Sequence, residues 1–414
     1  MTKLTSRVGH RPIFRSTTIL PSREMSPYSR HLTNERFAGR VADFLSLFSP
    51  RSRQASEVNP QRIGVLAQWG IGDAVLLLPL LRGLKQACPH ASLELIGKPW
   101  LSDLFAGEGF CDRTHTLVPP WTSYTSKYRI LSKPWWVFIT QTAEVRRHNF
   151  DWLISVRFDL REILQLRLLR ARETFGFAAA GGRRWVSRDF ELDRAAYDLL
   201  HRDALSAKAL KAIVPTALSH PTRFQVQPAA QERARQWLWL NGYRGGPVLV
   251  VHSGAGNPLR RWREQRFDSV IKALVIAPAF IVFIEEQHPS PTSDWLTTPH
   301  SVWRGGLADL KALLSVCHVF LGTDSGVMHM AAASGCKVVA AFGPGEPRWF
   351  RPSGEGHEIG IVEPMRCRPC RDACIHTRPL CFDQLADAVL SSAVDRKLVE
   401  ARDFARASNL PRWH

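Results

Sequence analysis

The sequence predicts an α/β protein with two doubly wound domains, each a parallel sheet covered by helices on both faces. Short apolar runs, which fit buried strands, alternate with segments of helical period. This alternation occurs twice, on either side of a polar, glycine-bearing stretch at 241–246. A length of 414 residues accommodates two domains of ordinary size. We therefore expect two sheets that face each other across a cleft, with ligands bound beyond the carboxyl ends of the strands.

The individual elements follow from the same patterns. A tail over residues 1–60 precedes a first domain at 61–242, and the second domain occupies 243–414, with the linker at 241–246. The expected strands are 62–68, 92–97, 150–156, 247–252, 279–284, 316–321 and 337–342, and the expected helices include 73–87, 264–276 and 307–314.

The chain is strongly basic, with a formal charge of +18. Such a charge favours anionic partners such as phosphate-bearing glycolipids, membrane surfaces or nucleic acid. No nucleic-acid-binding motif is recognisable, so we expect no specific nucleic-acid partner. No apolar run approaches the roughly 18 residues of a membrane-spanning helix, so none is expected.

The tail over residues 1–60 accounts for +6 of the charge, with ten Lys/Arg against four Asp/Glu. It is rich in Ser, Arg and Pro and shows no sustained period, which is typical of a largely disordered segment. A short helix around 35–48 fits the pattern. An organelle transit peptide would have a similar composition, and that interpretation stays open.

The first turn at a strand end contains Gly70, Gly72 and Asp73. It has half of a dinucleotide-binding fingerprint, but the third glycine and the later acidic residue are missing, so we do not expect NAD binding. Glycine lets another molecule approach the backbone closely. The carboxylate of Asp73 at the start of a helix fits a functional group and a plain N-cap equally well.

The second turn, residues 252–262, combines small residues with paired arginines. Ser253 and Gly254 permit close approach of a ligand, and Arg260 and Arg261 supply charge for a diphosphate. No Walker lysine motif occurs in the chain, so this turn is not a P-loop.

The third turn, residues 322–335, is the most informative. It connects an apolar run to an alanine-rich helical segment and carries Asp324, Ser325 and Gly326. A helix that starts here points free N–H groups and the positive end of its dipole at a ligand. His329 lies one helical turn after Ser325 and can reach the same anion. A simple N-cap at Asp324 or Ser325 is the alternative.

In combination these motifs resemble glycosyltransferase family 9, the heptosyltransferases that build the inner core of bacterial lipopolysaccharide. The resemblance extends from about residue 61 to about residue 390. The family implies a GT-B fold of two Rossmann-like domains, inversion at the anomeric carbon and no catalytic metal. Four segments carry the resemblance, in the family's order: 72–82, 254–262, 323–333 and 342–347.

The resemblance also implies roles for individual residues. Asp73, next to Gly72 on the acceptor side, would take the proton of the acceptor hydroxyl. Arg260 stands where the family commonly has a lysine, which keeps the charge and changes its geometry. Glu286 would hold the ribose of the donor. The full donor side is expected to comprise Ser253, Gly254, Arg260, Glu286, Asp324, Ser325, Gly326, Val327 and His329.

Two departures from the family bear on the identity of the donor. His252 and Ser253 replace the usual Pro-Gly opening of the second turn, and Arg263 follows Trp262 where proline is common.

Four of the eight cysteines, Cys367, Cys370, Cys374 and Cys381, lie within 15 residues. Their spacing allows a structural zinc or iron site, whereas the last two gaps are unusual for a zinc ribbon. Reduced thiols or a disulfide are the alternatives. The remaining cysteines fit packing positions in a reducing compartment, which indicates a cytoplasmic protein.

The segment 121–136 is both aromatic and basic. Trp121, Lys127 and Arg129 are candidates for binding a saccharide acceptor that carries acidic groups. Tryptophans packed inward in a loop and helix explain the pattern equally well. If the segment binds the acceptor, the enzyme works as a peripheral protein at the inner face of the cytoplasmic membrane.

The sequence and the resemblance together predict an inverting, metal-independent glycosyltransferase. We expect it to move heptose from ADP-heptose to a lipid-linked anionic saccharide such as the lipopolysaccharide core. A member of the family that uses another nucleotide sugar is one alternative. A non-catalytic saccharide- or lipid-binding protein on the same fold is the other.

Overall fold

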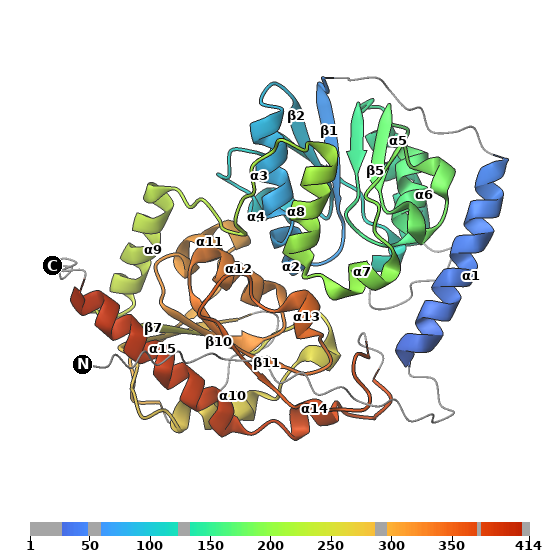
Figure 1. The fold of residues 1–414 in the computed structure, drawn as a ribbon. Coiled ribbons are helices and arrows are strands. Elements are labelled where there is room, and N and C mark those ends of the chain that lie inside the picture. Colours follow the sequence, from blue (N-terminus) through green and yellow to red (C-terminus); the bar gives the residue numbers. More distant parts are fainter. Residues whose placement is uncertain (1–26, 49–58, 123–132, 286–295, 371–373, 408–414) are drawn as a thin grey trace, which may run out of the picture.

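The protein is described here by a computed structural model, which covers residues 27–48, 59–122, 133–285, 296–370 and 374–407. Within these ranges the chain forms two domains, each with a six-stranded parallel sheet and helices on both faces (Figure 1). The first sheet contains β1 (Arg62–Ala67), β2 (Ser92–Gly97), β3 (Arg113–Thr116), β4 (Trp152–Ile154), β5 (Glu173–Gly176) and β6 (Arg188–Asp189). The second contains β7 (Val248–His252), β8 (Phe280–Ile284), β9 (His300–Trp303), β10 (Val319–Thr323), β11 (Lys337–Phe342) and β12 (Glu358–Ile361).

The two sheets have the same winding. Their orders are β3-β2-β1-β4-β5-β6 and β12-β11-β10-β7-β8-β9. Counted from the first strand of each domain, both follow 3-2-1-4-5-6, the order of the Rossmann fold. The predicted fold, two doubly wound Rossmann-like domains, is confirmed.

The helices divide between the domains. The first domain has α1 (Pro27–Leu47), α2 (Ile71–Val75), α3 (Leu78–Ala87), α4 (Leu101–Leu104), α5 (Lys133–Arg146), α6 (Leu160–Leu169), α7 (Arg194–Leu199) and α8 (Arg202–Ile213). The second has α9 (Pro228–Leu240), α10 (Glu264–Lys272), α11 (Leu307–Leu314), α12 (Gly326–Ser334), α13 (Pro347–Phe350), α14 (Leu380–Asp383) and α15 (Asp387–Ala407).

The crossover between the domains lies earlier in the chain than the sequence suggested. Helix α9 packs against α11, and the rings of Trp237 and Trp303 meet edge to face with centroids 4.8 Å apart. Helix α9 therefore belongs to the second domain, and the chain crosses over within 214–227. The stretch at 241–246 is the turn from α9 into β7. The expectation differed because a polar, glycine-bearing sequence suits a tight turn as well as a linker.

Most expected elements are present, and the differences have local causes. The helix expected at 73–87 is split into α2 and α3, because Pro79 at the start of α3 cannot donate a backbone hydrogen bond. Five strands have no counterpart in the prediction: β3, β5, β6, β9 and β12. All but β5 lie at sheet edges, and β3 is largely polar and exposed, so it lacks the apolar run that marks a buried strand. Strand β5 is internal and buried, but its four residues, Glu173–Gly176, form no apolar run either.

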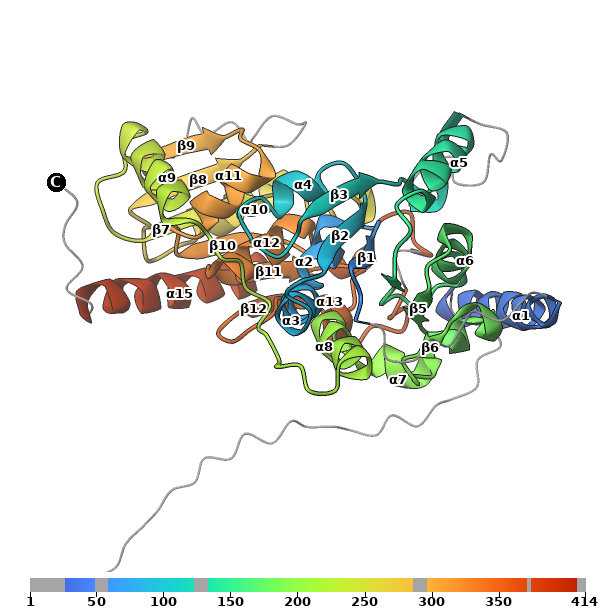
Figure 2. The ribbon, with the colours of Figure 1, turned by 90° about the horizontal axis from the view of Figure 1, so that it is seen from above.

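Helix α1 is longer than the helix expected around 35–48 in the tail, and it is part of the first domain. It lies along the outer side of that domain (Figures 1 and 2). Ala42 is buried there, and the backbone N–H of Arg183 donates to the Asp43 carboxylate at 2.9 Å. Residues 1–26 and 49–58 of the predicted tail are outside the described ranges.

Among the described residues, three pairs of helices pack across the domains: α2 with α12, α4 with α11, and α7 with α13. Between α4 and α11, the buried ammonium of Lys311 contacts the carbonyl of Ala106 at 2.8 Å and the Glu108 carboxylate at 3.2 Å. Near α7 and α13, the indole N–H of Trp349 donates to the carbonyl of Asp198 at 2.7 Å. Among the described helices, none is long and apolar enough to cross a membrane.

Candidate active site

Most of the predicted site residues lie just after the strands at the centre of each sheet, where the direction in which successive strands are added reverses. In the first sheet the reversal lies between β1 and β4, and in the second between β7 and β10. Ligands of doubly wound proteins bind beyond the carboxyl ends of the strands at this point. The segments that leave these strands are 68–73 and 155–157 in the first domain, and 253–260 and 324–327 in the second.

Helices α2 and α12 bring the two reversal points together. A Cβ added to Gly72 would lie 2.5 Å from Cδ2 of His329, and one added to Gly326 would lie 2.7 Å from the Cβ of Ile71. Both distances are far inside van der Waals contact, so glycine is needed on each side of the approach. The acceptor-side turn and the donor-side turn predicted from the sequence therefore form one site.

Asp73 lies at this junction, in the first turn of α2. Its carboxylate accepts a hydrogen bond from the N–H of Gly70 at 3.1 Å and forms an ion pair with Arg157 at 2.5 Å. Burial by itself raises the pKa of Asp73, but Arg157, the Gly70 N–H and Arg260 outweigh it and hold that pKa below its usual value. Asp73 thus caps its own helix and is also an ionised group that faces a cation of the second domain.

The sequence did not identify the neighbours that control Asp73. Arg157 follows β4, and its guanidinium also stacks on Trp69, 4.1 Å from the ring centroid. Lys98 follows β2; burial lowers its pKa, and the charge of Asp73 partly offsets this. Both are cations just beyond strand ends, which is the one sequence signal that could have found them.

Glu162 in α6 is a third group that the sequence did not reveal. It is buried, and its carboxyl group contacts the indole N–H of Trp69 and the hydroxyl of Ser155. Burial raises the pKa of Glu162 to about 7, although Arg157 opposes the shift. The carboxyl group is therefore partly protonated near neutral pH, a few side chains from Asp73.

On the donor side, Arg260 and Asp324 form an ion pair at 3.0 Å. Asp324 is buried and lies against the turn at 343–345, where a Cβ on Gly345 would be 1.9 Å from its carboxylate. Arg368 supports this turn, since its guanidinium donates to the carbonyl of Gly345 at 3.0 Å. The ion pair with Asp324 thus holds the guanidinium of Arg260 next to the turn at 322–335.

Ser325 is the N-cap of α12, one of the two interpretations left open by the sequence. Its hydroxyl accepts from the N–H of Met328 at 3.3 Å and lies 3.4 Å from Nδ1 of His252. This cap does not use the N–H groups of Gly326 and Val327, which belong to the first turn and have no acceptor within the helix. The cap and an anion site are therefore compatible at this helix end.

His329 is buried, and its Nδ1 has no hydrogen-bond partner among the described residues. Burial, His201 and Arg260 lower the pKa of His329 to about 3, against the opposing charges of Asp73 and Asp203. The ring is therefore neutral at physiological pH. It offers a hydrogen bond to a ligand and carries no positive charge of its own.

The remaining donor-side residues lie in the loop after β7 or outside the description. Ser253 and Gly254 are partly exposed, and the hydroxyl of Thr323 donates to the carbonyl of Gly254 at 3.3 Å. Glu286 lies outside the described residues.

Of the three acceptor candidates in 121–136, only Trp121 is described; Lys127 and Arg129 lie outside the described residues. Trp121 is buried and packs edge to face on Phe138, with ring centroids 5.1 Å apart. This matches the inward-packing alternative for this side chain. The guanidinium of Arg161 lies over the rings of both Trp121 and Trp69, 5.9 and 5.3 Å from their centroids, which places Trp121 one side chain away from the turn that carries Asp73. The role of Trp121 in acceptor binding stays a prediction.

The cysteine cluster lies against the turn that covers Asp324. All eight cysteines are free, and the thiol of Cys370 contacts the carbonyl of Pro344 at 3.6 Å. The disulfide alternative is therefore not realised. Cys367, Cys374 and Cys381 do not join Cys370 in any group of three closely spaced metal-ligand atoms within the described part of the chain.

One such group does occur elsewhere in the described residues, at Glu94, His115 and His148. The Glu94 carboxylate there is already shared by His115 at 2.5 Å, Arg62 at 3.2 Å and Ser92 at 2.9 Å. These contacts offset the cost of burying the Glu94 carboxylate in the first domain.

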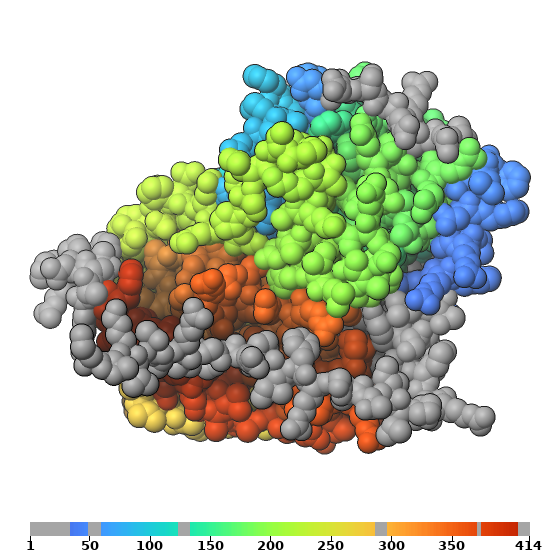
Figure 3. Space-filling view, viewed as in Figure 1, coloured from blue at the N-terminus to red at the C-terminus, as the bar shows by residue number. Residues whose placement is uncertain are grey.

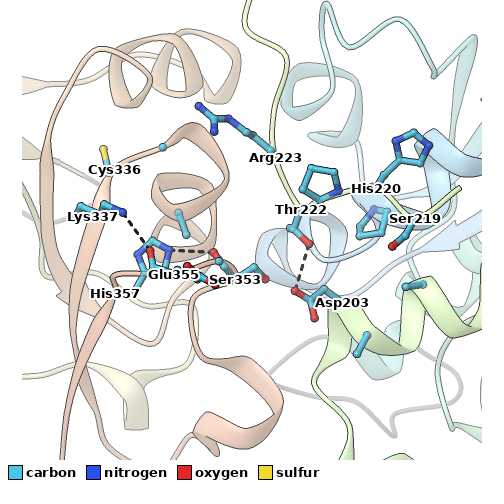
Figure 4. Close-up of a pocket in the computed structure, with 17 residues that line it drawn as sticks. Asp203, Ser219, His220, Thr222, Arg223, Cys336, Lys337, Ser353, Glu355 and His357 are labelled. Carbon is cyan, nitrogen blue, oxygen red and sulfur yellow. Dashed lines mark hydrogen bonds between the residues drawn. The ribbon is translucent and has the colours of Figure 1, made fainter. Parts of the chain in front are cut away.

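A cavity of about 550 Å³ lies at the other end of α12 (Figure 4). Asp203 and Thr222 line it from the first domain and the crossover, and Lys337 and His357 line it from the second domain. The C-terminal end of α12 lines this cavity, whereas Gly326 and His329, closer to its N-terminus, contact the turn that carries Asp73.

Comparison with known proteins is consistent with this geometry. The model of glycosyltransferase family 9 (heptosyltransferase) matches residues 142–378, more than half of the chain. A direct comparison with curated protein sequences finds no match.

Several solved structures have the same fold. The glycosyl transferase of family 9 from Veillonella parvula is 18% identical, with a TM-score of 0.62. The match covers 84% of this chain and 100% of that chain. The E. coli ADP-heptose lps heptosyltransferase II is 15% identical, with a TM-score of 0.60 and coverage of 82% and 99%. E. coli heptosyltransferase WaaC with ADP is 14% identical, with a TM-score of 0.59 and coverage of 81% and 99%.

The raised pKa of Glu162 predicts how stability depends on pH. Above the ordinary value of 4.5 the unfolded chain loses this proton, whereas the folded protein keeps it up to about 7. The folded state is therefore progressively disfavoured as the pH rises through this window. Between pH 4.5 and 7 this should lower the free energy of unfolding by on the order of 1–3 kcal/mol. Glu162→Gln resembles the protonated acid and should remove this decrease. Denaturant unfolding of both proteins at several pH values measures it, and parallel pH profiles would contradict the assignment.

Proposed function

The chain belongs to glycosyltransferase family 9, and on that premise we propose that it transfers heptose from ADP-heptose to a lipid-linked anionic saccharide such as the lipopolysaccharide core. One observation carries the proposal. The ionised Asp73 of the first domain lies in the same electrostatic cluster as Arg260 and His329 of the second. The structural neighbour WaaC, described with ADP, supports an ADP-linked donor.

In the proposed reaction Asp73 accepts the proton of an acceptor hydroxyl. The hydroxyl oxygen then forms a bond to the anomeric carbon of the donor, and the bond from that carbon to the β-phosphate oxygen breaks. Its electron pair leaves with ADP, and attack from the opposite face inverts the anomeric centre. The lowered pKa keeps Asp73 ionised at neutral pH, which is the form that a base requires.

The charge that develops on the diphosphate is stabilised from the second domain. The N–H groups of Gly326 and Val327 and the positive end of α12 face the junction. Arg260 turns from Asp324 to the phosphates, while Ser253 and Gly254 leave room for them. These groups take the part that a divalent cation plays in other glycosyl transfers, so we propose that catalysis needs no metal.

The acceptor side and the location of the enzyme complete the proposal. A lipid-linked acceptor places the enzyme at the inner face of the cytoplasmic membrane as a peripheral protein. The net charge of +18 suits an anionic acceptor and an anionic membrane surface.

Replacement of Asp73 tests its role as the base. Asp73→Asn should lower transfer by about a hundredfold or more, the usual scale for loss of a general base. Asp309→Asn is a matched control, because Asp309 also lies three residues after a glycine N-cap, at the start of α11. Transfer assays with both variants separate catalysis from helix capping. Equal, small effects in the two variants would remove Asp73 from the mechanism.

Replacement of Arg260 tests the diphosphate site. Because a charge-assisted hydrogen bond contributes about 1.5–3 kcal/mol, Arg260→Ala should weaken ADP binding roughly tenfold or more. Arg261→Ala is the control, since that guanidinium donates to the carbonyl of Ala255 within its own loop, at 2.9 Å. AMP, which lacks the second phosphate, should be less sensitive to Arg260→Ala. Calorimetry decides, and equal ADP affinities in both variants would refute this site.

Chelation tests the proposed independence from metal. Transfer should proceed at an unchanged rate in EDTA, because backbone N–H groups and Arg260 neutralise the leaving diphosphate. A loss of activity in EDTA that magnesium restores would show that a metal takes part. Melting temperatures measured in the same buffers separate such an effect from loss of a structural metal.

A further inference from the structure

Helix α1 packs on the first domain through its small side chains. Gly39, Ala42 and Ser46 are buried, and the Cα of Gly39 lies close to Gly181. With about 100° per residue, these three positions share one face of the helix. The large apolar side chains of the helix are therefore not used for packing on the domain.

Those side chains lie on the opposite face and are exposed. Phe37, Val41, Phe44 and Phe48 are spaced by four, three and four residues, which places them in a single stripe. Their exposed fractions are 71%, 42%, 60% and 77%. The rings of Phe44 and Phe48 contact each other edge to face, with centroids 5.3 Å apart. A stripe of this kind on a monomer marks an interaction surface.

The neighbouring helix α6 also exposes apolar side chains. Helix α6, which contacts α1, exposes Leu164 and Leu168 one helical turn apart. In the space-filling view α1 forms the edge of the first domain on the side away from the second domain (Figure 3). The stripe therefore belongs to the domain that we propose binds the acceptor.

The charges around the stripe are positive. Arg36 and Arg40 are exposed along one flank of it. The acidic side chains of the helix are engaged with the domain, since Glu35 pairs with Arg194 and Asp43 accepts from the N–H of Arg183. Residues 1–26, which precede the helix, add five Lys/Arg against one Asp/Glu.

We propose that α1 is an interfacial helix that docks the first domain on an anionic lipid surface. Aromatic and aliphatic side chains would enter the boundary between headgroups and acyl chains, while Arg36 and Arg40 contact the lipid phosphates. This inference rests on the proposed function only in that a lipid-linked acceptor is found at such a surface. A second copy of the chain fits less well, because the exposed face of α1 offers cations and no free carboxylate to pair with them.

Vesicle binding of the full chain tests the proposal. The protein should sediment with vesicles of phosphatidylcholine and phosphatidylglycerol and bind weakly to phosphatidylcholine alone. Phe37→Ser with Phe44→Ser should reduce binding to the anionic vesicles by about tenfold or more. Leu240→Ser with Val275→Ser is the matched control, because these side chains are 67% and 85% exposed in the second domain and should not affect binding.

A second variant separates the charge from the apolar contact. Arg36→Gln with Arg40→Gln should lower the preference for anionic lipid and leave the weak binding to phosphatidylcholine unchanged. The proposal fails if the unmodified protein does not sediment with anionic vesicles, or if the two serine variants bind equally. It also fails if light scattering shows a dimer that only the phenylalanine variant dissociates.

Failure of this inference can be told apart from failure of the proposed function. ADP affinity, measured by calorimetry without vesicles, should be the same in the unmodified protein and in both serine variants. Absence of ADP binding would contradict the transferase proposal and leave the vesicle result intact. Normal ADP binding without vesicle binding would contradict the role of α1 alone.

Discussion

The first domain touches the second where Gly72 lies against the ring of His329, and the arrangement of the site depends on this contact. On one side of it the short helix α2 presents Asp73, and on the other the N-terminus of α12 presents its free N–H groups. A side chain at Gly72 or Gly326 would separate the two helices. The proposed base and the proposed diphosphate site would then no longer share one space. The close approach of two backbones thus does what a metal or a bound cofactor does in other enzymes, because it sets the distance between the reacting groups.

Two further contacts hold the domains on either side of this junction. Lys311 is buried with the Glu108 carboxylate, which also accepts from Arg82 and from the backbone N–H of Gln225 in the crossover. Removing one partner of such a buried pair leaves an uncompensated charge and strongly destabilises the protein, so the two domains must keep this contact. At the other side Trp349 donates to the backbone of α7. The crossover, α4 and α11 therefore meet in one polar cluster, which restricts the angle between the domains.

The sequence was sufficient for the fold, and it also marked the turns that the structure brings together between the domains, because both leave local signals. Strands such as 92–97 and 337–342 are apolar runs and occur as predicted, whereas the edge strand β3 is polar and was missed. The partner of Asp73 could not be predicted, since Arg157 is 84 residues away and only the pairing of β1 with β4 brings it close. Burial decided the state of His329 as well. Its lowered pKa makes it a neutral group, which the motif alone does not show.

The most direct test of the contact between Gly72 and His329 is the effect of Gly72→Ala on transfer and on ADP affinity. The added methyl group would meet the buried ring of His329 at 2.5 Å, so the helices must move apart or the ring must shift. Transfer should fall by about tenfold to a hundredfold, because the proposed base, Asp73, is displaced from the donor. ADP binding should weaken less, and the melting temperature should show that the protein remains folded. Unchanged transfer and ADP affinity in a folded Gly72→Ala protein would mean that the domains do not meet at this contact in the working enzyme.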